Sequence, residues 1–531
     1  MSLLRSAATV GGMTLISRVL GFIRDVLIGG ALGTGPVADA FVVAFRFPNL
    51  FRRFFAEGAF NSAFVPLFAK RMEAEGADAA RQFAEESLSV LLVALIVLTL
   101  IAEIAMPFLM IAMAPGFVDD PARFDLSVLF TRIALPYLLC MSLVALFSGI
   151  LNSIGRFSLP ALAPVLLNVI LIGALLFAAP HLPSAGHALV WGVALAGFAQ
   201  LGLVAFGCAR SGMVLRLRMP KLTPGVRQLL ALGVPGVIAG GITQINLVVG
   251  QFIASFQDGA VSILYYADRV YQLPLGLIGV AMGVVLLPDI ARRLRGGDRA
   301  GALDSQNRAL ELSMLLTLPA AVACAVVALP IITVLFEATS RAFMGDSAFT
   351  AEDSRRTAGA LAAFAFGLPA FVLIKVFQPA YFAREDTATP MRFAAVNTVV
   401  NIVLGVILFR LFGIVGLAAA TSMAAWVNTG LLYRGLSAQG DFEADGRLRR
   451  VMPRIGLASV GMGLALLAVQ AALGSWMAGG YVWQVAGLCV LVLGGVVVFA
   501  VLAQLLGAAR LGILLADLRG RPHAMDGMGT E

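Results

Sequence analysis

Long apolar stretches separated by short polar turns dominate the chain. A membrane-spanning helix needs about 20 predominantly apolar residues, and fourteen segments of the sequence reach that length. They cover residues 7–33, 36–65, 87–113, 128–151, 160–180, 187–208, 226–256, 262–288, 309–336, 357–383, 391–412, 414–433, 455–474 and 481–508. The pattern predicts an all-α integral membrane protein with about 14 transmembrane helices.

The composition supports lipid as the surrounding solvent. Of the 531 residues, 60% are hydrophobic and only 13% are charged, whereas soluble domains carry about 25% charged residues. So few charges cannot cover a water-facing surface of this size. Because Arg18 and Arg24 interrupt the first apolar run, we expect a retained helix there rather than a cleaved signal peptide.

Basic residues are concentrated in alternate loops. With the N-terminus in the cytoplasm, 25 of the 38 Lys and Arg residues lie in loops or tails on the cytoplasmic side, and five lie in the opposite loops. Positive charge marks the cytoplasmic side, so both termini of this multi-pass protein are expected there. The net charge of +8 then indicates contact with anionic membrane lipids and not with nucleic acid.

A faint internal repeat divides the chain. Residues 66–71, which close the second apolar segment, resemble residues 288–293, which close the eighth, 222 positions later. Leu-Pro pairs at 135 and 368, and prolines at 160 and 390, have similar offsets. Because six spans separate the copies, they share one orientation, as in transporters with parallel repeats. We expect six-helix lobes at 1–219 and 220–442, two additional helices at 443–510, and a cytoplasmic tail at 511–531.

Several charged residues fall inside the predicted spans. The basic ones are Arg18, Arg24, Arg46, Arg52, Arg53, Arg132, Arg269 and Lys375, and the acids at similar depth are Asp25, Asp39, Glu57 and Asp268. An arginine at the centre of a membrane helix costs about 2.5–3.5 kcal/mol. The excess of positive charge therefore predicts a wet, cationic central cavity. Guanidinium groups match phosphate geometry, which favours an anionic substrate.

Polar residues follow one face of the second and eighth spans. The stripes consist of Asp39, Arg46, Asn49, Arg53, Glu57 and Asn61, and of Ser262, Tyr265, Arg269 and Gln272. On the first span, Arg18 and Asp25 are expected to share a face. Structural roles remain alternatives: ion pairing within the second span, and membrane-interface anchoring for Arg18, Arg24 and Arg132.

Three sequence motifs resemble the MurJ/MviN lipid II flippases. They are Ser-Arg-Val-Leu-Gly-Phe-Ile-Arg-Asp at 17–25, Pro-Asn-Leu-Phe-Arg-Arg-Phe-Phe-Ala-Glu-Gly-Ala-Phe at 48–60, and Tyr-Tyr-Ala-Asp-Arg at 265–269 followed by Pro274 and Pro288. The resemblance runs from the N-terminus to about residue 434. It implies the fold of the multidrug/oligosaccharidyl-lipid/polysaccharide exporter superfamily: two six-helix lobes around a cationic cavity, plus two helices that offer a groove to a lipid tail.

The resemblance also implies a function. These proteins move lipid II, the undecaprenyl-pyrophosphate-linked peptidoglycan precursor, to the periplasmic leaflet of the bacterial inner membrane by alternating access, in cell wall biogenesis and cell shape. The essential arginines of the family correspond to Arg18, Arg24, Arg52 and Arg269, and a functional acid corresponds to Asp39. Supporting cavity residues are expected at Asp25, Asn49, Arg53, Glu57 and Gln272. Some members carry an acid at the position of Gln272, so the neutral residue weakens any ion coupling there.

Other functions were weighed against this one. An exporter of another polyprenyl-diphosphate-linked oligosaccharide, as for O-antigen, fits the same charges, whereas a multidrug exporter would favour acids in its cavity. An intramembrane glycosyltransferase would need catalytic acids in an outer loop, but the loop at 337–356 mixes acids with arginines and shows no motif. A scaffold of the division machinery would not need buried arginines.

We expect a transporter and not an enzyme. Four dispersed cysteines and three dispersed histidines predict no disulfide and no metal site. Because transport needs no covalent chemistry, we expect no catalytic residue and no cofactor. A coupling cation and the membrane potential remain alternative driving forces. The expected partners are lipid II and membrane lipids, with cell-wall synthesis or division proteins as further candidates.

Overall fold

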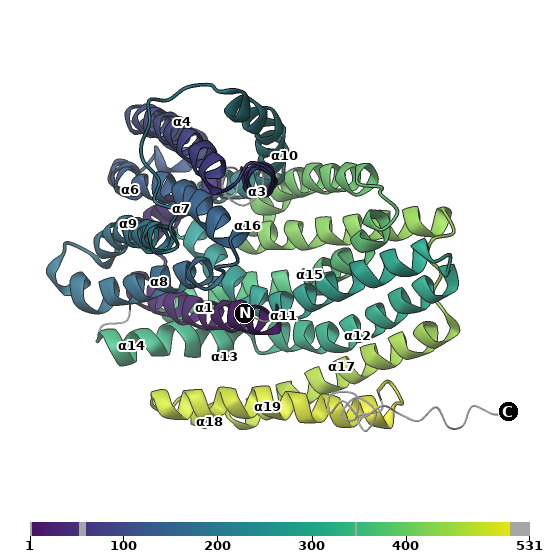
Figure 1. The fold of residues 1–531 in the computed structure, drawn as a ribbon. Helices are drawn as coiled ribbons and strands as arrows, with labels where there is room; N and C mark the ends of the chain where they lie inside the picture. The colour runs from purple at the N-terminus through teal and green to yellow at the C-terminus, as the bar shows by residue number, and fades with distance from the viewer. Residues whose placement is uncertain (1–2, 53–59, 346–347, 510–531) are drawn as a thin grey trace. The chain divides into compact units, whose positions relative to one another are not determined.

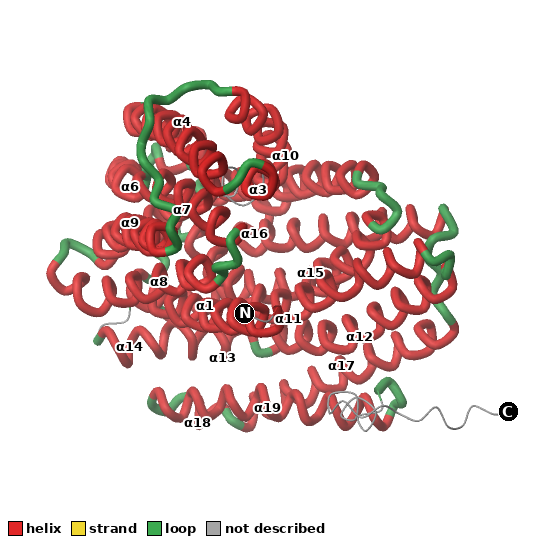
Figure 2. Tube along the Cα trace, in the orientation of Figure 1, coloured by secondary structure: helices red, strands yellow, loops and turns green. Residues whose placement is uncertain are grey.

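The computed structural model describes residues 3–52, 60–345 and 348–509. Every regular element in these ranges is helical, and none of the described residues forms a strand (Figure 2). This confirms the predicted all-α class. The described residues of the fourteen predicted apolar segments lie mostly in helices, whereas the count of fourteen spans stays a prediction.

The described residues pack as two compact units, and the first comprises Met1–Tyr266 with Thr339–Asp353. Its helices are α1 (Leu3–Leu32), α2 (Pro36–Arg52), α3 (Phe60–Ala74), α4 (Ala77–Ile104), α5 (Met106–Met113), α6 (Pro121–Ala134), α7 (Pro136–Ser153), α8 (Ser158–Gly173), α9 (Ala185–Arg210), α10 (Pro224–Ala254), the start of α11 (Ala260–Arg295) and α14 (Thr339–Met344). A π-helical segment, Ala174–Ala178, continues α8. Helices α1 and α8 lie side by side (Figure 1).

The second unit comprises Ala267–Ala338 and Ser354–Glu531. It holds the rest of α11, α12 (Arg299–Val326), α13 (Ala328–Ile332), most of α15 (Ala351–Phe382), α16 (Ala388–Ala438), α17 (Gly446–Ala472), α18 (Gly474–Met477) and α19 (Tyr481–Leu505). Helices α17 and α19 pack against each other (Figure 1). The lobe boundaries predicted near 219 and 442 concern the transport lobes and remain predictions.

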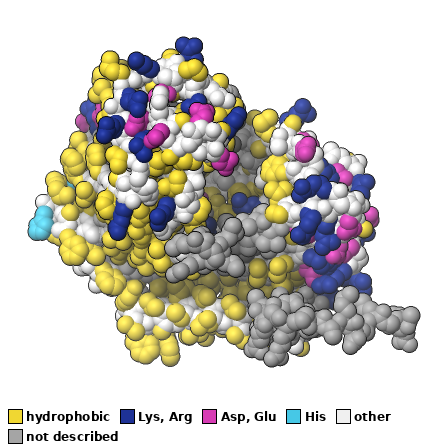
Figure 3. Space-filling model, in the orientation of Figure 1, with side chains coloured by type: hydrophobic (Ala, Val, Ile, Leu, Met, Phe, Trp, Pro, Cys, Tyr) yellow, Lys and Arg dark blue, Asp and Glu magenta, His cyan; other side chains and the backbone are white. Residues whose placement is uncertain are grey.

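Among the described residues, nine helical segments are long and apolar enough to cross a membrane. Large hydrophobic side chains lie exposed on their outer faces, such as Phe198 of α9 at 58% and Leu493 of α19 at 66%. Hydrophobic side chains cover wide areas of the face in Figure 3. Exposed apolar area on this scale would aggregate in water, so the surface fits a lipid environment.

Prolines and glycines divide the long apolar segments. Pro136 follows Leu135 and separates α6 from α7 within one predicted span. Helix α16 runs for 51 residues, but Gly413 interrupts it with φ 58° and ψ −136°. The helix is therefore interrupted between the spans predicted to end at 412 and to begin at 414.

Charged contacts join the helix ends of the second unit. Asp289 of α11 accepts hydrogen bonds from Ser305 at 2.6 Å, Arg292 at 2.6 Å and Arg293 at 3.0 Å. The Ser305 hydroxyl and the two guanidinium groups hold the pKa of the Asp289 carboxyl at about 2. Asp289 therefore stays ionised at neutral pH and links the end of α11 to α12.

A second group of charges ties α17 to α12. Arg308 of α12 contacts both Glu311 and Asp445, and Arg447 donates to Glu311 at 2.8 Å. Asp445 also caps α17, accepting from the backbone N–H of Leu448 at 2.6 Å. The first of the two predicted additional helices is thus fixed to its own unit by ion pairs as well as by apolar packing.

Candidate anion-binding site and buried acid

Arg24 lies on α1 with its guanidinium group enclosed by polar and aromatic partners. Its Nε and Nη2 donate to the carboxylate of Asp25 at 3.0 and 2.6 Å, and its Nη1 donates to Asn168 of α8 at 2.8 Å. The side chain is 9% exposed, and its Cζ lies 5.5 Å from the centroid of the Phe45 ring. A charge with so little solvent needs such compensation.

Neighbouring groups fix these partners in turn. Asn168 donates to the backbone oxygen of Ser17 at 2.9 Å, and Tyr265 donates to Asp25 at 3.1 Å. A Cβ on Gly21 would lie 3.5 Å from the Asn168 amide, so the glycine leaves room for the amide. The sequence predicted Arg18 and Asp25 on one face, but Asp25 pairs with Arg24.

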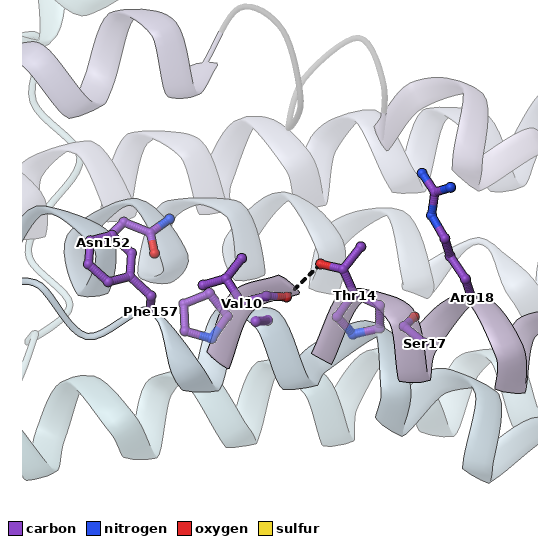
Figure 4. Close-up of a pocket in the computed structure, with 9 residues that line it drawn as sticks. Val10, Thr14, Ser17, Arg18, Asn152 and Phe157 are labelled. Atoms are coloured by element: carbon purple, nitrogen blue, oxygen red, sulfur yellow. Dashed lines mark hydrogen bonds between the residues drawn. The ribbon is translucent and has the colours of Figure 1, made fainter. Parts of the chain in front are cut away.

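Arg18 is exposed and borders a cavity of about 340 Å³ in the first unit (Figure 4). It lies at one end of the labelled residues, with Asn152 and Phe157 at the other end. The lining residues are Val10, Thr14, Ser17, Arg18, Asn152, Phe157, Pro160, Ala161 and Pro164. No acid lines this cavity, and Arg18 makes no ion pair with the described residues, so its charge is available to an anion.

The predicted stripe on α2 is only partly described. The guanidinium carbon of Arg46 lies 5.5 Å from the ring centroid of Tyr265, and Asn49 donates to the backbone oxygen of Phe45 at 2.7 Å. Arg52 is the last residue of α2. Arg53 and Glu57 lie outside the described residues.

Asp39 of α2 is fully enclosed, with 0% of its surface exposed. Its Oδ1 accepts from the backbone N–H and the hydroxyl of Ser262 at 2.8 and 2.7 Å, and its Oδ2 accepts from the backbone N–H of Gly259 at 3.1 Å. Arg123 of α6 also donates to Oδ2. This carboxylate joins α2 and α6 to the turn between α10 and α11.

Close backbone packing surrounds the same turn. Gly259 has φ 71°, and a Cβ there would lie 2.4 Å from the backbone oxygen of Thr34. Tyr266 donates to the backbone oxygen of Gly33 at 2.9 Å, and Ser255 accepts from the backbone N–H of Gly116 at 3.0 Å. The turn therefore fits its neighbours at several points, and Gly259 cannot be replaced there without movement.

Arg123 is the residue that sequence reasoning missed. Its position in an outer loop, four residues after Asp119, predicted a solvent-exposed side chain. The side chain is only 2% exposed. Asp120 accepts from the backbone N–H of Arg123 at 3.2 Å, capping α6 so that the arginine enters its first turn. The Asp-Pro pair at 120–121 was the available signal, because this pair is typical of a helix start.

The second unit carries the remaining predicted residues. Gln272 is exposed on α11 and donates to Asp268, one helical turn away. Arg269 lies between them in sequence and is partly buried. Among the described residues, no group of three or more His, Cys, Asp or Glu side chains could hold a metal ion.

These features define a class of protein: an all-helical membrane protein that encloses an arginine and an acid among polar partners. Among solved structures, the chain is similar to one titled "Lipid II flippase MurJ, inward closed conformation", with a TM-score of 0.76 and 25% identity, covering 96% of this chain and 99% of that one. A multidrug resistance MATE family transporter of the MOP superfamily, in an inward-facing conformation, shares the fold at a TM-score of 0.66 and 16% identity, covering 82% and 98%.

Sequence comparison identifies the particular family. The family model described as "Lipid II flippase MurJ" matches residues 28–487. A protein of Rhizobium meliloti (strain 1021) named "Probable lipid II flippase MurJ" is 50% identical over 470 residues, which cover 88% of this chain and 86% of the relative. The chain belongs to the lipid II flippase MurJ family, as the three motifs predicted.

Proposed function

We propose that this chain moves lipid II from the cytoplasmic to the periplasmic leaflet of a bacterial inner membrane. The observation that carries the proposal is the family match over residues 28–487. The membrane character of the helices and the arginines on α1 support it. The transport step moves a head group and needs no covalent chemistry.

The diphosphate of lipid II is the part of the substrate that arginines suit best. Arg24 is held by Asp25 and Asn168, so its orientation is set before an anion arrives, and Arg18 is exposed beside a cavity. Pre-set donors bind more tightly because less side-chain entropy is lost. The proposed diphosphate-binding set is Arg18, Arg24, Arg52 and Arg269, with Asp39 as a functional acid and Asp25, Asn49, Arg53, Glu57 and Gln272 in support.

The proposed architecture has fourteen spans with both termini in the cytoplasm. The cavity of two six-helix lobes, 1–219 and 220–442, would open alternately to the two sides of the membrane. The helices of 443–510 would offer a groove to the lipid tail. The apolar and exposed faces of α17 and α19 support that groove. A coupling cation and the membrane potential are the candidate driving forces.

The closed outer side is proposed at the turn between α10 and α11. This turn and the described residues of 339–353 pack with other parts of the first unit. Ser340 donates to the backbone oxygen of Gly30 at 2.6 Å, and Thr34 contacts Asp353. In the predicted topology these residues lie at the periplasmic ends of the spans, so their contacts would have to open for the substrate to leave.

Complementation tests the proposal. Cells depleted of their own lipid II flippase lyse when peptidoglycan synthesis fails for want of exported precursor. Expression of this chain should restore growth and cell shape, and expression of Arg24→Ala should not, at equal membrane levels on an immunoblot. If the intact chain reaches the membrane and does not restore growth, lipid II export is not its function.

A further inference from the structure

A fully buried carboxylate needs a positive partner, and Asp39 has one in Arg123. We infer that Arg123 is a positioning residue that holds the buried carboxylate of Asp39 in place, and so determines how readily the turn between α10 and α11 leaves the first unit. The inference rests on the proposed alternating access. It adds a residue that the family resemblance did not assign.

Arg123 is itself held firmly. Its side chain is 2% exposed, and its guanidinium carbon lies 3.8 Å from the centroid of the Phe117 ring. The Asp120 cap fixes the backbone at the start of α6. Arg123 is therefore a rigid feature of α6 that meets the carboxylate of α2, rather than a mobile surface cation.

The guanidinium group serves two carboxylates that differ in burial. Its Nη2 donates to the fully buried Asp39, and its Nη1 donates to Asp258 at 2.9 Å. The Asp258 side chain is 97% exposed. Asp258, Gly259 and Ser262 all belong to the turn and the start of α11, whereas Asp39 and Arg123 belong to α2 and α6. One ion pair thus stays within α2 and α6, and the other joins them to the turn.

This arrangement predicts how the turn responds when Arg123 is lost. With the turn in place, Asp39 is shielded from water and depends on Arg123 to offset the loss of hydration. With the turn released, water could hydrate the carboxylate. Removing the guanidinium group therefore disfavours the packed state more than the released state, and the turn should leave more often.

The weaker contact predicts a smaller effect. An ion pair with one exposed partner contributes little, so Asp258→Asn should loosen the turn only slightly. Removing both buried charges, in Arg123→Gln with Asp39→Asn, leaves no uncompensated charge. The double variant should therefore hold the turn better than Arg123→Gln alone.

Thiol labelling from the periplasmic side measures release of the turn. Ala260 is fully buried at the start of α11, so Ala260→Cys, in a chain whose four native cysteines are replaced by alanine, reports exposure of the turn. A membrane-impermeant maleimide is applied to spheroplasts. Arg123→Gln should raise the labelling rate about tenfold, equivalent to about 1.4 kcal/mol, and the double variant should return most of the way to the parent rate.

Arg132→Gln is the matched control. Arg132 lies on the same helix, but it is 44% exposed and meets Glu103 at 3.8 Å, so its loss should change the labelling rate less than about twofold. Equal rates for Arg123→Gln and Arg132→Gln would overturn the inference. A double variant that labels as fast as Arg123→Gln would also overturn it, because the charge of Asp39 would then not be the cause.

Milder variants cover the case in which Arg123→Gln does not reach the membrane. Arg123→Lys keeps the charge but lacks the planar fork that serves two acceptors, so it and Asp258→Asn should each raise labelling about threefold, equivalent to about 0.7 kcal/mol. Parent rates in both would contradict the inference. Labelling needs no substrate, so the inference about Arg123 can be overturned while complementation confirms lipid II export. Likewise, complementation can fail while labelling supports the role of Arg123.

Discussion

A single arginine on α1 shows how this protein encloses a charge among polar partners. Arg24 uses one side of its guanidinium group for Asp25 and another nitrogen for Asn168. Asp25 also accepts from Tyr265, which shares its negative charge. Removing one member of a buried pair is costly, at about 3–5 kcal/mol, so Asp25 supports the fold as well as the orientation of Arg24.

Replacing Arg24 tests its proposed contact with the diphosphate. A charge-assisted hydrogen bond contributes about 1.5–3 kcal/mol, so Arg24→Ala should lower export about 10- to 100-fold. Arg24→Lys should recover only part of it, because an ammonium group restores charge without the planar fork. Export per unit of membrane protein is measured in depleted cells. Arg410→Ala, at an exposed position of α16, is the control and should leave export unchanged.

The result that would contradict this role is equally clear. If Arg24→Ala complements at a normal membrane level, Arg24 does not bind the substrate. Asp25→Asn helps to separate the two roles. A purely structural pair predicts that both variants lose membrane protein to a similar extent. Substrate binding predicts that Arg24→Ala loses more export per unit of membrane protein than Asp25→Asn does.

Sequence reasoning succeeded with residues whose depth follows from a regular helix. Arg24 stands well inside a long apolar segment and Asp39 stands in the first turn of the next one, so their place on a membrane helix could be predicted. Arg123 could not be placed in the same way, because its depth depends on how a short connection folds back onto α2. Partner choice was also not predictable: side chains of neighbouring residues reached each other in the Arg24–Asp25 pair, although helix geometry favoured the spacing of Arg18 and Asp25.

At the scale of helices, breaks within long apolar segments are built into the sequence. Gly413 adopts φ 58° and ψ −136° in α16, a conformation open to glycine and strained for other residues. Three residues later, a Cβ on Gly416 would lie 2.0 Å from the backbone oxygen of Leu408. Both glycines are needed where α16 turns from one predicted span into the next.

Substitution of Gly413 tests the break. Gly413→Ala forces a side chain into a sparsely populated backbone region, which costs about 1–3 kcal/mol, and should lower the thermal unfolding midpoint of the detergent-purified protein. Gly430→Ala, on the same helix with no atom near its added Cβ, should be neutral or stabilising by up to about 1 kcal/mol. Equal midpoints for the two variants would show that the break carries no strain.

At the scale of the whole chain, loop charge gives the strongest statement that sequence can make about orientation. Reporter fusions at residues 120 and 345 should behave as periplasmic, and a fusion at residue 215 should behave as cytoplasmic. The reason is that 25 of the 38 basic residues lie on one side of the predicted topology. Alkaline phosphatase and fluorescent-protein fusions measure this, and a cytoplasmic signal at 345 would break the fourteen-span topology.

The helical class and the family could be predicted from the sequence. Hydropathy indicates the helices, and three short motifs indicate the family. The composition of the two compact units was not accessible in the same way. Residues 339–353 belong to the first unit although the helices on either side of them belong mostly to the second. That assignment depends on side-chain contacts such as Ser340 with Gly30, which hydropathy does not encode.

The central claim is that the chain carries lipid II across the membrane, and the amount of lipid II exposed on the outer leaflet tests it most directly. Cells depleted of their own flippase are supplied with the intact chain or with Arg24→Ala, and their outer-leaflet lipid II is cleaved by an added periplasmic-side enzyme and quantified. The account predicts normal exposure with the intact chain and strongly reduced exposure with Arg24→Ala, at equal membrane levels. Exposure that stays at the depleted level with the intact chain present in the membrane would contradict it.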